Sequence, residues 1–593
     1  MCRIAGVLNK ASDAILADTI AMRDSMAHGG PDGSGIYHDV DAGLAFGHRR
    51  LSLIDLTVGG HQPMLNDAED VVISFNGEIY NYKELKAELI SKGFQFRTAS
   101  DTEVILTGYQ YWGVECFSRL VGMFAIAIYD KRKHELILAR DTQGIKPLYY
   151  GNSNGAFFFA SEIRAFKALK YNWEESDTWK AYTLVYGFIP EPHTTLADVK
   201  MLPKGRYMCI DVNTMQSSLV EYSKDDYSVR IDTEKEALAA IRQWIDKAVD
   251  RHLISDAPIG LFLSGGIDSS LLTLIAKETG HNDLHTLSIV FDDAAYSEAA
   301  YQQLIVDKVK SQHKSYNLSK EEYINALPDI FKAMDQPSID GVNSYFICKF
   351  AKEYGLKAVL SGLGADELFG GYASFGREKV VSNLKKIPSG LLAASRYIKK
   401  DKYRKLAYLA DGHITNEYLF HRGLFSIREA AEILDSDIKS VADTVQNIAL
   451  ADGVETLPYG NKVSYLEKNI YMQSQLLKDT DVMSMWHSIE VRVPFLDTEL
   501  VKIVNSISPE VKYNGAIPKQ LLVKAYDDIL PRQIWDRKKQ GFVFPFQSWI
   551  KGSEYTCFKY VDDKIKNRYQ SGTINWTRYW AYLVTNNFNY LHS

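Results

Sequence analysis

The chain contains few cysteines, five among its 593 residues. They occupy positions 2, 116, 209, 348 and 557, and no two of them form a C-x-x-C pair. This spacing excludes a cysteine-based zinc site and gives no disulfide framework. We expect the last four to be small hydrophobic residues, whereas Cys2 has a chemical option that only its position provides.

The sequence also lacks a long apolar segment and a concentration of positive charge. No apolar run approaches the ~20 residues that a membrane-spanning helix needs, and the first residues show no signal-peptide pattern. A net charge of -6 with interleaved signs argues against a nucleic-acid-binding surface. We therefore expect a cytoplasmic, globular protein whose partners include neither nucleic acid nor membrane.

No Walker A motif, G-x-x-x-x-G-K-[ST], occurs in the chain. A different phosphate loop is predicted where the apolar stretch 260–263 leads into Ser264-Gly265-Gly266-Ile267-Asp268-Ser269-Ser270 and a helical pattern. The glycines let backbone N–H groups approach an anion, and the helix directs its positive end to the same place. Asp268 could hold a magnesium ion on the phosphates. The alternative is an ordinary strand-to-helix turn, which a glycine pair alone would favour.

A second strand pattern, at 357–360, ends in another glycine-rich loop with carboxylates, Ser361 to Tyr372. Alternating strands and helices from Thr233 onward predict a doubly wound parallel sheet, in which ligands bind past the carboxyl ends of the strands. Two such loops on neighbouring strands can converge on one triphosphate, with Asp268 and Asp366 bracketing magnesium. Either loop alone could be structural, but the two together favour an ATP site.

Cys2 becomes the first residue if the initiator Met1 is removed, as is usual before a small second residue. Its thiol and free α-amine then supply a nucleophile and a base on one residue, because an α-amine pKa of roughly 8 is close to working pH. A cysteine at position 2 is also compatible with chance. The downstream residues decide between the two interpretations.

Three further stretches supply groups that a cysteine nucleophile would use. Arg49 and Arg50 lie on a predicted strand and could place a guanidinium against a substrate carboxylate. Strand residues 72–75 run into Asn76-Gly77, whose side-chain amide and bare backbone N–H suit an oxyanion hole, unless the pair is a hairpin turn. The third stretch, residues 100–103, contains two carboxylates, although capping the following helix would be a sufficient role for it.

The chain is long enough for at least two domains. Apolar segments at 122–130, 136–141 and 146–150 alternate with turns and predict an antiparallel meander. We place a first domain at 1–222, a charged linker at 223–232 and a second domain at 233–593. The part of the second domain after Glu554 is expected to be mainly helical.

Two later segments admit two interpretations each. The segment 490–497, EVRVPFLD, is either an ion-paired helix end capped by a proline turn or a contact with substrate. The segment 537–542, RKKQGF, is either a solvated basic face or the source of a cation that adenylation chemistry requires.

Residues 1–222 resemble the class II glutamine amidotransferase domain, an N-terminal-nucleophile hydrolase with two stacked antiparallel sheets between helices. The whole chain resembles the glutamine-hydrolysing asparagine synthetase family, because Cys2, SGGIDSS, SGLGADELFGGY, EVRVPFLD and RKKQGF occur in the family's order. For glutamine, the resemblance implies Cys2 as nucleophile, Asn76 and Gly77 at the oxyanion, Arg50 on the carboxylate, and Glu78 and Asp101 on the amine. For the second site it implies ATP contacts from Leu263, Ser264, Gly265, Gly266, Asp268, Ser269, Ile289, Ser361 and Gly362, and Mg²⁺ ligands from Asp268 and Asp366. Lys539 is then the catalytic lysine, because the family spacing is R-x-K-x-G-F.

By this resemblance ATP activates a carboxylate as an acyl-adenylate, Cys2 releases ammonia from glutamine, and ammonia displaces AMP. Because water would protonate the ammonia, we expect the two domains to enclose a passage and to share a substantial, apolar interface. A homodimer is a further expectation from the family.

Two positions depart from the family's pattern. The family usually has arginine where this chain has Gly29, and Arg50 is the better candidate for the carboxylate. It also has a glutamate, thought to help ammonia attack, where this chain has Leu363, so either Glu367 takes the proton or the acceptor differs from aspartate. The segment 335–345 also departs from the usual aspartate-binding sequence and resembles a branch thought to amidate other carboxylates, such as sugar uronates. We expect conversion of aspartate to asparagine first, another carboxylate acceptor second, and a non-catalytic scaffold as the alternative from another class.

Overall fold

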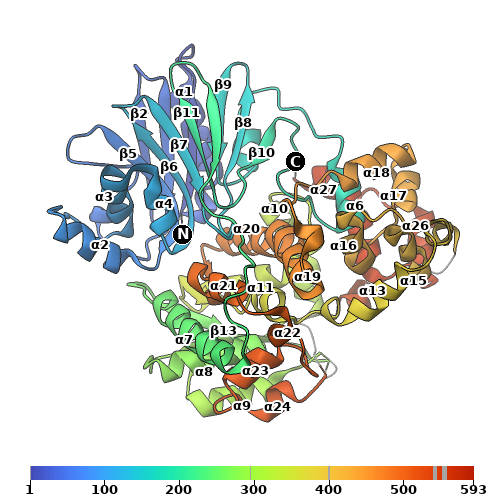
Figure 1. The fold of residues 1–593 in the computed structure, drawn as a ribbon. Helices are drawn as coiled ribbons and strands as arrows, with labels where there is room; N and C mark the ends of the chain where they lie inside the picture. Colours follow the sequence, from blue (N-terminus) through green and yellow to red (C-terminus); the bar gives the residue numbers. More distant parts are fainter. Residues whose placement is uncertain (1, 294–295, 399–400, 539–543, 551–556, 593) are drawn as a thin grey trace.

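The computed structural model describes residues 2–293, 296–398, 401–538, 544–550 and 557–592. Within these residues the first part of the chain forms two antiparallel sheets of six strands (Figure 1). The first sheet has the order β10 (Val199–Met201), β8 (Tyr149–Ser153), β9 (Ala156–Ala160), β1 (Arg3–Leu8), β3 (Leu44–Arg50) and β2 (Gly33–Asp39). The second has the order β12 (Ser217–Glu221), β11 (Arg206–Asp211), β7 (Glu135–Arg140), β6 (Gly122–Asp130), β5 (Val71–Ile79) and β4 (Met64–Leu65).

These two sheets stack face to face and are covered by helices on both outer faces. Side chains between the sheets form one apolar core, which includes Ile4, Phe46 and Ala127. Helix α1 (Ile15–Ser25) covers the outer face of the first sheet, and helices α2 (Tyr82–Ser91) and α3 (Asp101–Trp112) cover the outer face of the second. The predicted sandwich is confirmed, because alternating strand residues bury one face against the partner sheet and the other against helices.

One detail of the predicted meander is wrong. Strands β5, β6 and β7 are neighbours in one sheet, as a meander requires, but β8 pairs with β9 and β10 in the other sheet. The apolar alternation is the same in both sheets, so the sequence pattern does not reveal where the chain crosses between them.

The second part of the chain contains a parallel sheet, as predicted. Its order is β15 (Gln312–Asn317), β14 (His285–Val290), β13 (Ile259–Phe262), β16 (Ala358–Leu360) and β17 (Glu490–Arg492). One core joins the sheet to helices α7 (Glu234–His252), α8 (Ile267–Glu278) and α9 (Ala299–Val309). Helices α10 (Lys320–Ala333), α11 (Val342–Glu353) and α20 (Lys478–Trp486) belong to the core on the other face. Helix α8 starts at Ile267, inside the predicted phosphate loop 264–270, so Asp268, Ser269 and Ser270 lie in its first turn.

A group of helices from the later sequence gathers beside these layers (Figure 1). It includes α16 (Ile414–Arg422), α17 (Ile427–Leu434), α18 (Ile438–Gln446), α26 (Asp563–Gln570) and α27 (Trp576–His592). Helix α6 (Trp179–Tyr186) packs against α17, α18 and α27, although it precedes the predicted linker in sequence. The two parts of the chain therefore share one continuous core.

Candidate functional site

Cys2 lies immediately before β1, where its side chain is 8% exposed. Its backbone N–H donates to Asn76 Oδ1 at 3.2 Å, and its thiol donates to the carbonyl oxygen of Leu51 at 3.9 Å. A small cavity of about 30 Å³ opens beside it. Of the residues predicted for glutamine, this cavity is lined by Cys2, Arg50, Gly77, Glu78 and Asp101. Asn76 contacts Cys2 from beside the cavity, so the structure brings all six predicted residues together.

Gly77 lies inside strand β5, which continues to Ile79. The prediction that the strand ends at Asn76-Gly77 is therefore wrong, and so is the hairpin-turn alternative. A Cβ at Gly77 would collide with the main chain of β6 at Met123. Glycine is needed here for close strand approach, and the unbroken strand fixes the positions of both Asn76 and Glu78.

Hydrogen bonds and an ion pair hold the charged side chains around this cavity in place. Arg50 donates to the carbonyl oxygens of Thr57 at 2.7 Å and Asp55 at 2.5 Å. Asp101 Oδ2 accepts the backbone N–H of Ile79 at 3.1 Å, and Glu78 pairs with Arg492 at 3.0 Å.

The two carboxyl groups are buried beside one another. Burial raises the pKa of Asp101 to about 6 and raises the pKa of Glu78 well above its usual range. An ammonium group placed between them would favour their ionised forms. The pair is thus suited to bind a cation.

Burial also raises the pKa of the Cys2 thiol, an effect that a nearby terminal amine opposes. A thiol in such surroundings needs a base before it can act as a nucleophile. The position of Cys2 makes its thiol a candidate nucleophile. The base that would activate this thiol is the α-amine that Cys2 carries once Met1 is removed.

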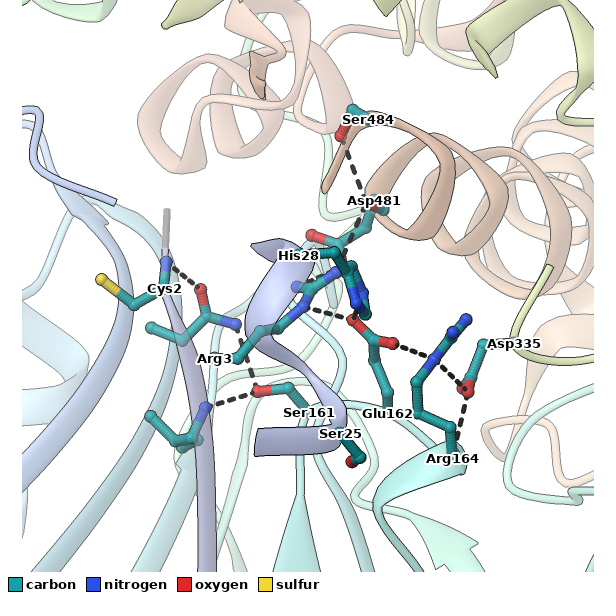
Figure 2. A network of polar contacts seen from close by, with 12 residues as sticks. Cys2, Arg3, Ser25, His28, Ser161, Glu162, Arg164, Asp335, Asp481 and Ser484 are labelled. Carbon is teal, nitrogen blue, oxygen red and sulfur yellow. Dashed lines mark hydrogen bonds and ion pairs between the residues drawn. The ribbon is translucent and has the colours of Figure 1, made fainter. Parts of the chain in front are cut away.

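The residue after Cys2 ties this cavity to the second part of the chain (Figure 2). Arg3 is fully buried, and its guanidinium contacts Glu162 at 2.5 Å and Asp481 at 2.8 Å. Lys146 also reaches Asp481, at 3.0 Å. Despite burial, these two cations hold the pKa of Asp481 below its ordinary value.

A second arm of the network shown in Figure 2 runs through Glu162. Arg164 contacts Glu162 at 2.6 Å, and its backbone N–H donates to Asp335 at 2.9 Å. The interface between the two parts thus combines the shared apolar core, as expected, with buried ion pairs that the prediction did not include. Gly29 belongs to the same packing, since a Cβ there would lie 2.7 Å from Arg3 Cγ.

Strand β17 separates two cavities. Arg492 pairs with Glu78 on the Cys2 side, and the charge of Glu490 acts on the Cys2 thiol. Val491, between them, lines the second cavity. Alternate strand residues point to opposite faces. The predicted helix end is wrong, because residues 490–492 form a strand, although the segment is ion-paired as predicted and Asp497 caps a helix, α21 (Thr498–Asn505). A contact with substrate stays a prediction.

The second cavity, of about 390 Å³, lies at the carboxyl ends of β13 and β16, which are neighbours in the sheet as predicted. Nine predicted residues line it: Leu263, Ser264, Gly266, Asp268, Ser269, Ile289, Ser361, Gly362 and Asp366. Gly265 is not among the lining residues, and its carbonyl oxygen accepts from Arg537 at 3.0 Å. A Cβ at Gly362 would lie 2.7 Å from Asp268 Cβ, so glycine allows the two loops to meet.

Lys519 is the residue that sequence reasoning missed. It directly precedes α23 (Gln520–Ala525), and its Nζ contacts both Asp268 and Asp366 at 2.5 Å. Despite burial, these carboxylates raise the pKa of Lys519. Its backbone φ is +56°, an uncommon value for a residue other than glycine and typical of functional positions. No glycine-rich motif surrounds it, so the sequence offers only an isolated Pro-Lys pair.

Asp268 and Asp366 are the two carboxylates of this cavity that could hold magnesium, and Lys519 contacts both of them here. Proteins hold Mg²⁺ through one or two carboxylates together with substrate phosphates. Among the described residues no three His, Cys, Asp or Glu side chains are grouped to hold a metal by themselves. A metal at Asp268 and Asp366 would therefore share its coordination with phosphate oxygens.

The basic segment near residue 537 is only partly described. Arg537 lines the cavity, stacks on Tyr301 at 3.8 Å and donates to Glu298 at 2.6 Å. Its neighbour Lys538 is exposed, as a solvated face would predict. The predicted catalytic lysine, Lys539, lies outside the described residues.

Comparisons with known proteins match both parts of the chain. The asparagine synthase family model matches residues 240–572, and the glutamine amidotransferase domain model matches residues 1–223. An asparagine synthetase [glutamine-hydrolyzing] 1 of Bacillus subtilis is 36% identical, covering 93% of this chain and 88% of its own length. A putative asparagine synthetase of Mycobacterium tuberculosis is 31% identical over 90% and 85%, and asparagine synthetase B of Escherichia coli is 29% identical over 95% and 86%. Among the described residues no helix is long and apolar enough to cross a membrane.

Proposed function

The chain belongs to the asparagine synthase family, and we propose that it is a glutamine-dependent ligase that joins ammonia to a carboxylate at the expense of ATP. One observation supports assigning a different half-reaction to each of the two cavities. A cavity holding a cysteine at the start of the chain and a cavity holding a phosphate loop lie on opposite sides of a single strand, β17. The two sites therefore share one element of the fold, β17, between them.

In the first cavity Cys2 would attack the amide carbon of glutamine. Once Met1 is removed, the nitrogen that now contacts Asn76 becomes the free α-amine and can accept the thiol proton. Arg50 would bind the glutamine carboxylate, and Glu78 with Asp101 would bind its ammonium group. Asn76 and the Gly77 N–H would hold the oxyanion. Ammonia leaves as the acyl-enzyme forms, and water then releases glutamate.

In the second cavity the loop 264–269 would bind the phosphates of ATP at the N-terminus of α8. Leu263, Ile289, Ser361 and Gly362 would contact the rest of the nucleotide. Mg²⁺ held by Asp268 and Asp366 would neutralise phosphate charge. Lys519, placed between these carboxylates, would stabilise the charge that develops as the acceptor carboxylate attacks the α-phosphate and pyrophosphate leaves.

Glu367 is the candidate base for the last step, in which ammonia displaces AMP from the acyl-adenylate. It lines the same cavity as Leu363. Burial, and then the charge of Asp366, raise its pKa to about 7. A carboxylate of that pKa accepts a proton efficiently near neutral pH, which is the role that Leu363 cannot fill.

Two acceptors follow from the same site. Aspartate is the acceptor that the names of the relatives imply, and it is the first to assay. A different carboxylate, such as a sugar uronate, is favoured by Leu363 and by the segment 335–345, which departs from the usual aspartate-binding sequence.

The proposal is tested by separating the two half-reactions. Cys2→Ala should abolish glutamine-dependent AMP formation, by about 10³-fold or more, and should leave ammonium-driven AMP formation within about threefold of wild type. Cys209→Ala, which removes a half-buried thiol in β11, is the matched control and should change neither rate. Failure of ammonium to restore the Cys2→Ala variant would contradict the two-site assignment, and absence of both activities in the wild type would favour a scaffold.

A further inference from the structure

A strongly basic segment of the chain, residues 377–405, lines neither of the two cavities. The segment contains ten lysines and arginines but two acidic residues, whereas the whole chain has a net charge of -6. The remainder of the chain is therefore acidic. The interleaving of charge signs that describes the sequence as a whole does not hold in this segment, where positive charge is concentrated.

This segment forms short helices on the outside of the helical group. They are α13 (Glu378–Leu384), α14 (Ser389–Ala394) and α15 (Asp401–Arg404), with 3₁₀ turns at Ser395–Tyr397 and Lys405–Leu409. Helix α14 packs on the second 3₁₀ turn, which packs in turn on α16. Helix α15 lies at the right-hand edge of the molecule in Figure 1, far from the two antiparallel sheets. The segment thus has one face toward the protein and one toward solvent.

Helix α14 carries apolar side chains on both of these faces. Leu392 is 3% exposed and anchors the helix to the protein, together with the buried Tyr408 of the second 3₁₀ turn. The neighbouring Leu391 is 66% exposed, and Tyr397 in the first 3₁₀ turn is 71% exposed. The inner face already packs the segment, so the fold itself does not require the outer apolar residues. Exposed apolar residues that gather in one place mark sites of interaction.

The outward apolar side chains lie close together. Leu391, Tyr397 and Ile398 belong to one short run of the chain, and all three are exposed. Arg404 Nε donates to the carbonyl oxygen of Ile398 at 3.2 Å, which brings α15 and its exposed Tyr403 beside them. These four apolar residues and two exposed cations of the same segment are here called the outer patch: Lys386, Leu391, Arg396, Tyr397, Ile398 and Tyr403.

The two cations of the outer patch keep their charge toward solvent. Lys386 Nζ donates to the side-chain oxygen of Asn383 at 3.4 Å, and Arg396 Nε donates to the carbonyl oxygen of Ala393 at 2.7 Å. Both acceptors are neutral. Among the residues that the structure describes, neither cation has an acidic side chain as a partner. Their charges therefore remain available to an anionic surface.

The acidic residues of the adjacent helix α17 are paired with arginines. Glu429 contacts Arg404 at 2.8 Å, and Glu432 contacts Arg428 at 3.1 Å. The guanidinium of Arg428 also lies 5.7 Å from the ring of Tyr397. Since these carboxylates are matched by cations, they do not cancel the positive charge of the outer patch.

We propose that the outer patch docks this protein on a membrane surface that contains anionic phospholipid. Lys386 and Arg396 would lie among the headgroup phosphates, where each cation near an anionic leaflet is attracted. Leu391 and Ile398 would enter the boundary between headgroups and acyl chains, and the tyrosines would lie at headgroup level, where this residue type is enriched. The inference is independent of the function proposed above, and it would overturn the expectation that no membrane is a partner.

Two other occupants match the outer patch less well. A second copy of the chain, bound about a twofold axis, would place the same patch on both sides and bring cations against cations. A nucleic acid would use the cations and could stack bases on the tyrosines, but it has no place for the aliphatic Leu391 and Ile398. The combination of cations with aliphatic side chains is what an anionic lipid surface complements.

The test is co-sedimentation of the purified full-length protein with lipid vesicles. We expect binding to vesicles of equal parts phosphatidylcholine and phosphatidylglycerol, and none to vesicles of phosphatidylcholine alone. Added salt should weaken the binding, because it screens exposed charges. Equal binding to both kinds of vesicle, or binding to neither, would overturn the proposal. So would retention on poly-L-glutamate without binding to vesicles, which would assign the patch to an acidic polypeptide.

Two variants separate the contributions of charge and apolar contact. Lys386→Gln with Arg396→Gln should weaken vesicle binding about 25-fold, because each cation near an anionic surface contributes about fivefold. The matched control, Lys83→Gln with Lys92→Gln, removes two exposed lysines around α2 and should change binding by less than about twofold. Equal losses in the two double variants would contradict docking through the outer patch.

Leu391→Ser keeps every charge and should still weaken vesicle binding about tenfold, because an apolar side chain no longer leaves water. Its control is Ile90→Ser, which changes an exposed apolar residue of α2 and should leave binding unchanged. Circular dichroism should show the wild-type spectrum for all four proteins. Unchanged binding in Leu391→Ser would overturn the proposed insertion. A wild-type dimer that Leu391→Ser makes monomeric, with vesicle binding unchanged, would assign the patch to a second copy of the chain and overturn the proposal.

Discussion

The two cavities of this chain are built in different ways. The Cys2 cavity, of about 30 Å³, is formed largely by strands and the segments that follow them, so that its side chains are fixed by strand register. The second cavity, of about 390 Å³, is formed by loops after β13 and β16 and by residues far apart in the chain. A site that handles one small amide can be built into a sheet, whereas a site that must hold a nucleotide and an acceptor together requires several independent segments.

The two cavities also differ in the groups that hold their cations. In the Cys2 cavity Arg50 is held by carbonyl oxygens. In the second cavity the central cation, Lys519, is held by the two carboxylates that would also serve magnesium. Removing a charge should therefore have its largest effect in the second cavity, where cation and carboxylates depend on one another.

Lys519→Met provides the largest expected effect. It removes the cation that contacts Asp268 and Asp366 while keeping the length of the side chain. We expect AMP formation to fall about 10³-fold, a typical loss when an electrostatic contact to the transition state is removed. Glutamine hydrolysis at Cys2 should persist, measured as glutamate release.

Lys524→Met is the matched control, because Lys524 lies in the same helix α23 and pairs at the surface with Glu234 at 2.8 Å. It should change AMP formation by less than about twofold, as expected for an exposed pair. An equal loss in the two variants would show that α23 acts by its fold rather than by the charge of Lys519.

The same difference decides how much could be predicted from the sequence. For the Cys2 cavity, all six predicted residues lie together, because short motifs on β3 and β5 and at the starts of β1 and α3 identify them. For the second cavity the two glycine-rich loops were predictable, because each ends a parallel strand. Lys519 was not, since it precedes a helix far downstream of both loops, 251 positions from Asp268, and no local pattern marks it.

The ion pairs of the interface could not be predicted either. The expected apolar character followed from the need to exclude water and is present in the shared core, but Arg3, Lys146 and Asp481 add paired charges there. A buried ion pair also excludes water when both partners are satisfied. Nothing in the sequence near Arg3 or Asp481 indicates that they meet, because 478 positions separate them.

Asp481→Asn tests whether this pairing holds the two cavities together. The change leaves Arg3 and Lys146 buried without their shared carboxylate, and breaking a buried pair costs about 3–5 kcal/mol. We expect the urea unfolding transition, followed by circular dichroism, to move to lower concentration by a corresponding amount. Glu234→Gln, which breaks the exposed pair with Lys524, is the control and should cost about 0–1 kcal/mol. Equal shifts in the two variants would contradict a structural role for Asp481.

The smallest expected effect concerns the proton that Leu363 cannot accept. If Glu367 is the base, it must be ionised, and burial with the charge of Asp366 sets its pKa at about 7. Its ionised fraction then rises about tenfold between pH 6 and pH 8, so the rate of amide formation should rise by about the same factor. The measurement uses ammonium as donor, with the concentration of free NH₃ held constant at each pH, so that only the enzyme titrates.

Glu367→Gln removes the carboxylate and keeps its shape. We expect a lower rate that no longer depends on pH between 6 and 8, while Glu353→Gln, at an exposed position of α11, should retain the wild-type profile. A profile that still rises in Glu367→Gln would assign the proton to another group of the second cavity. A flat profile would show that in this cavity a neighbour four residues along the same loop replaces the base missing at Leu363.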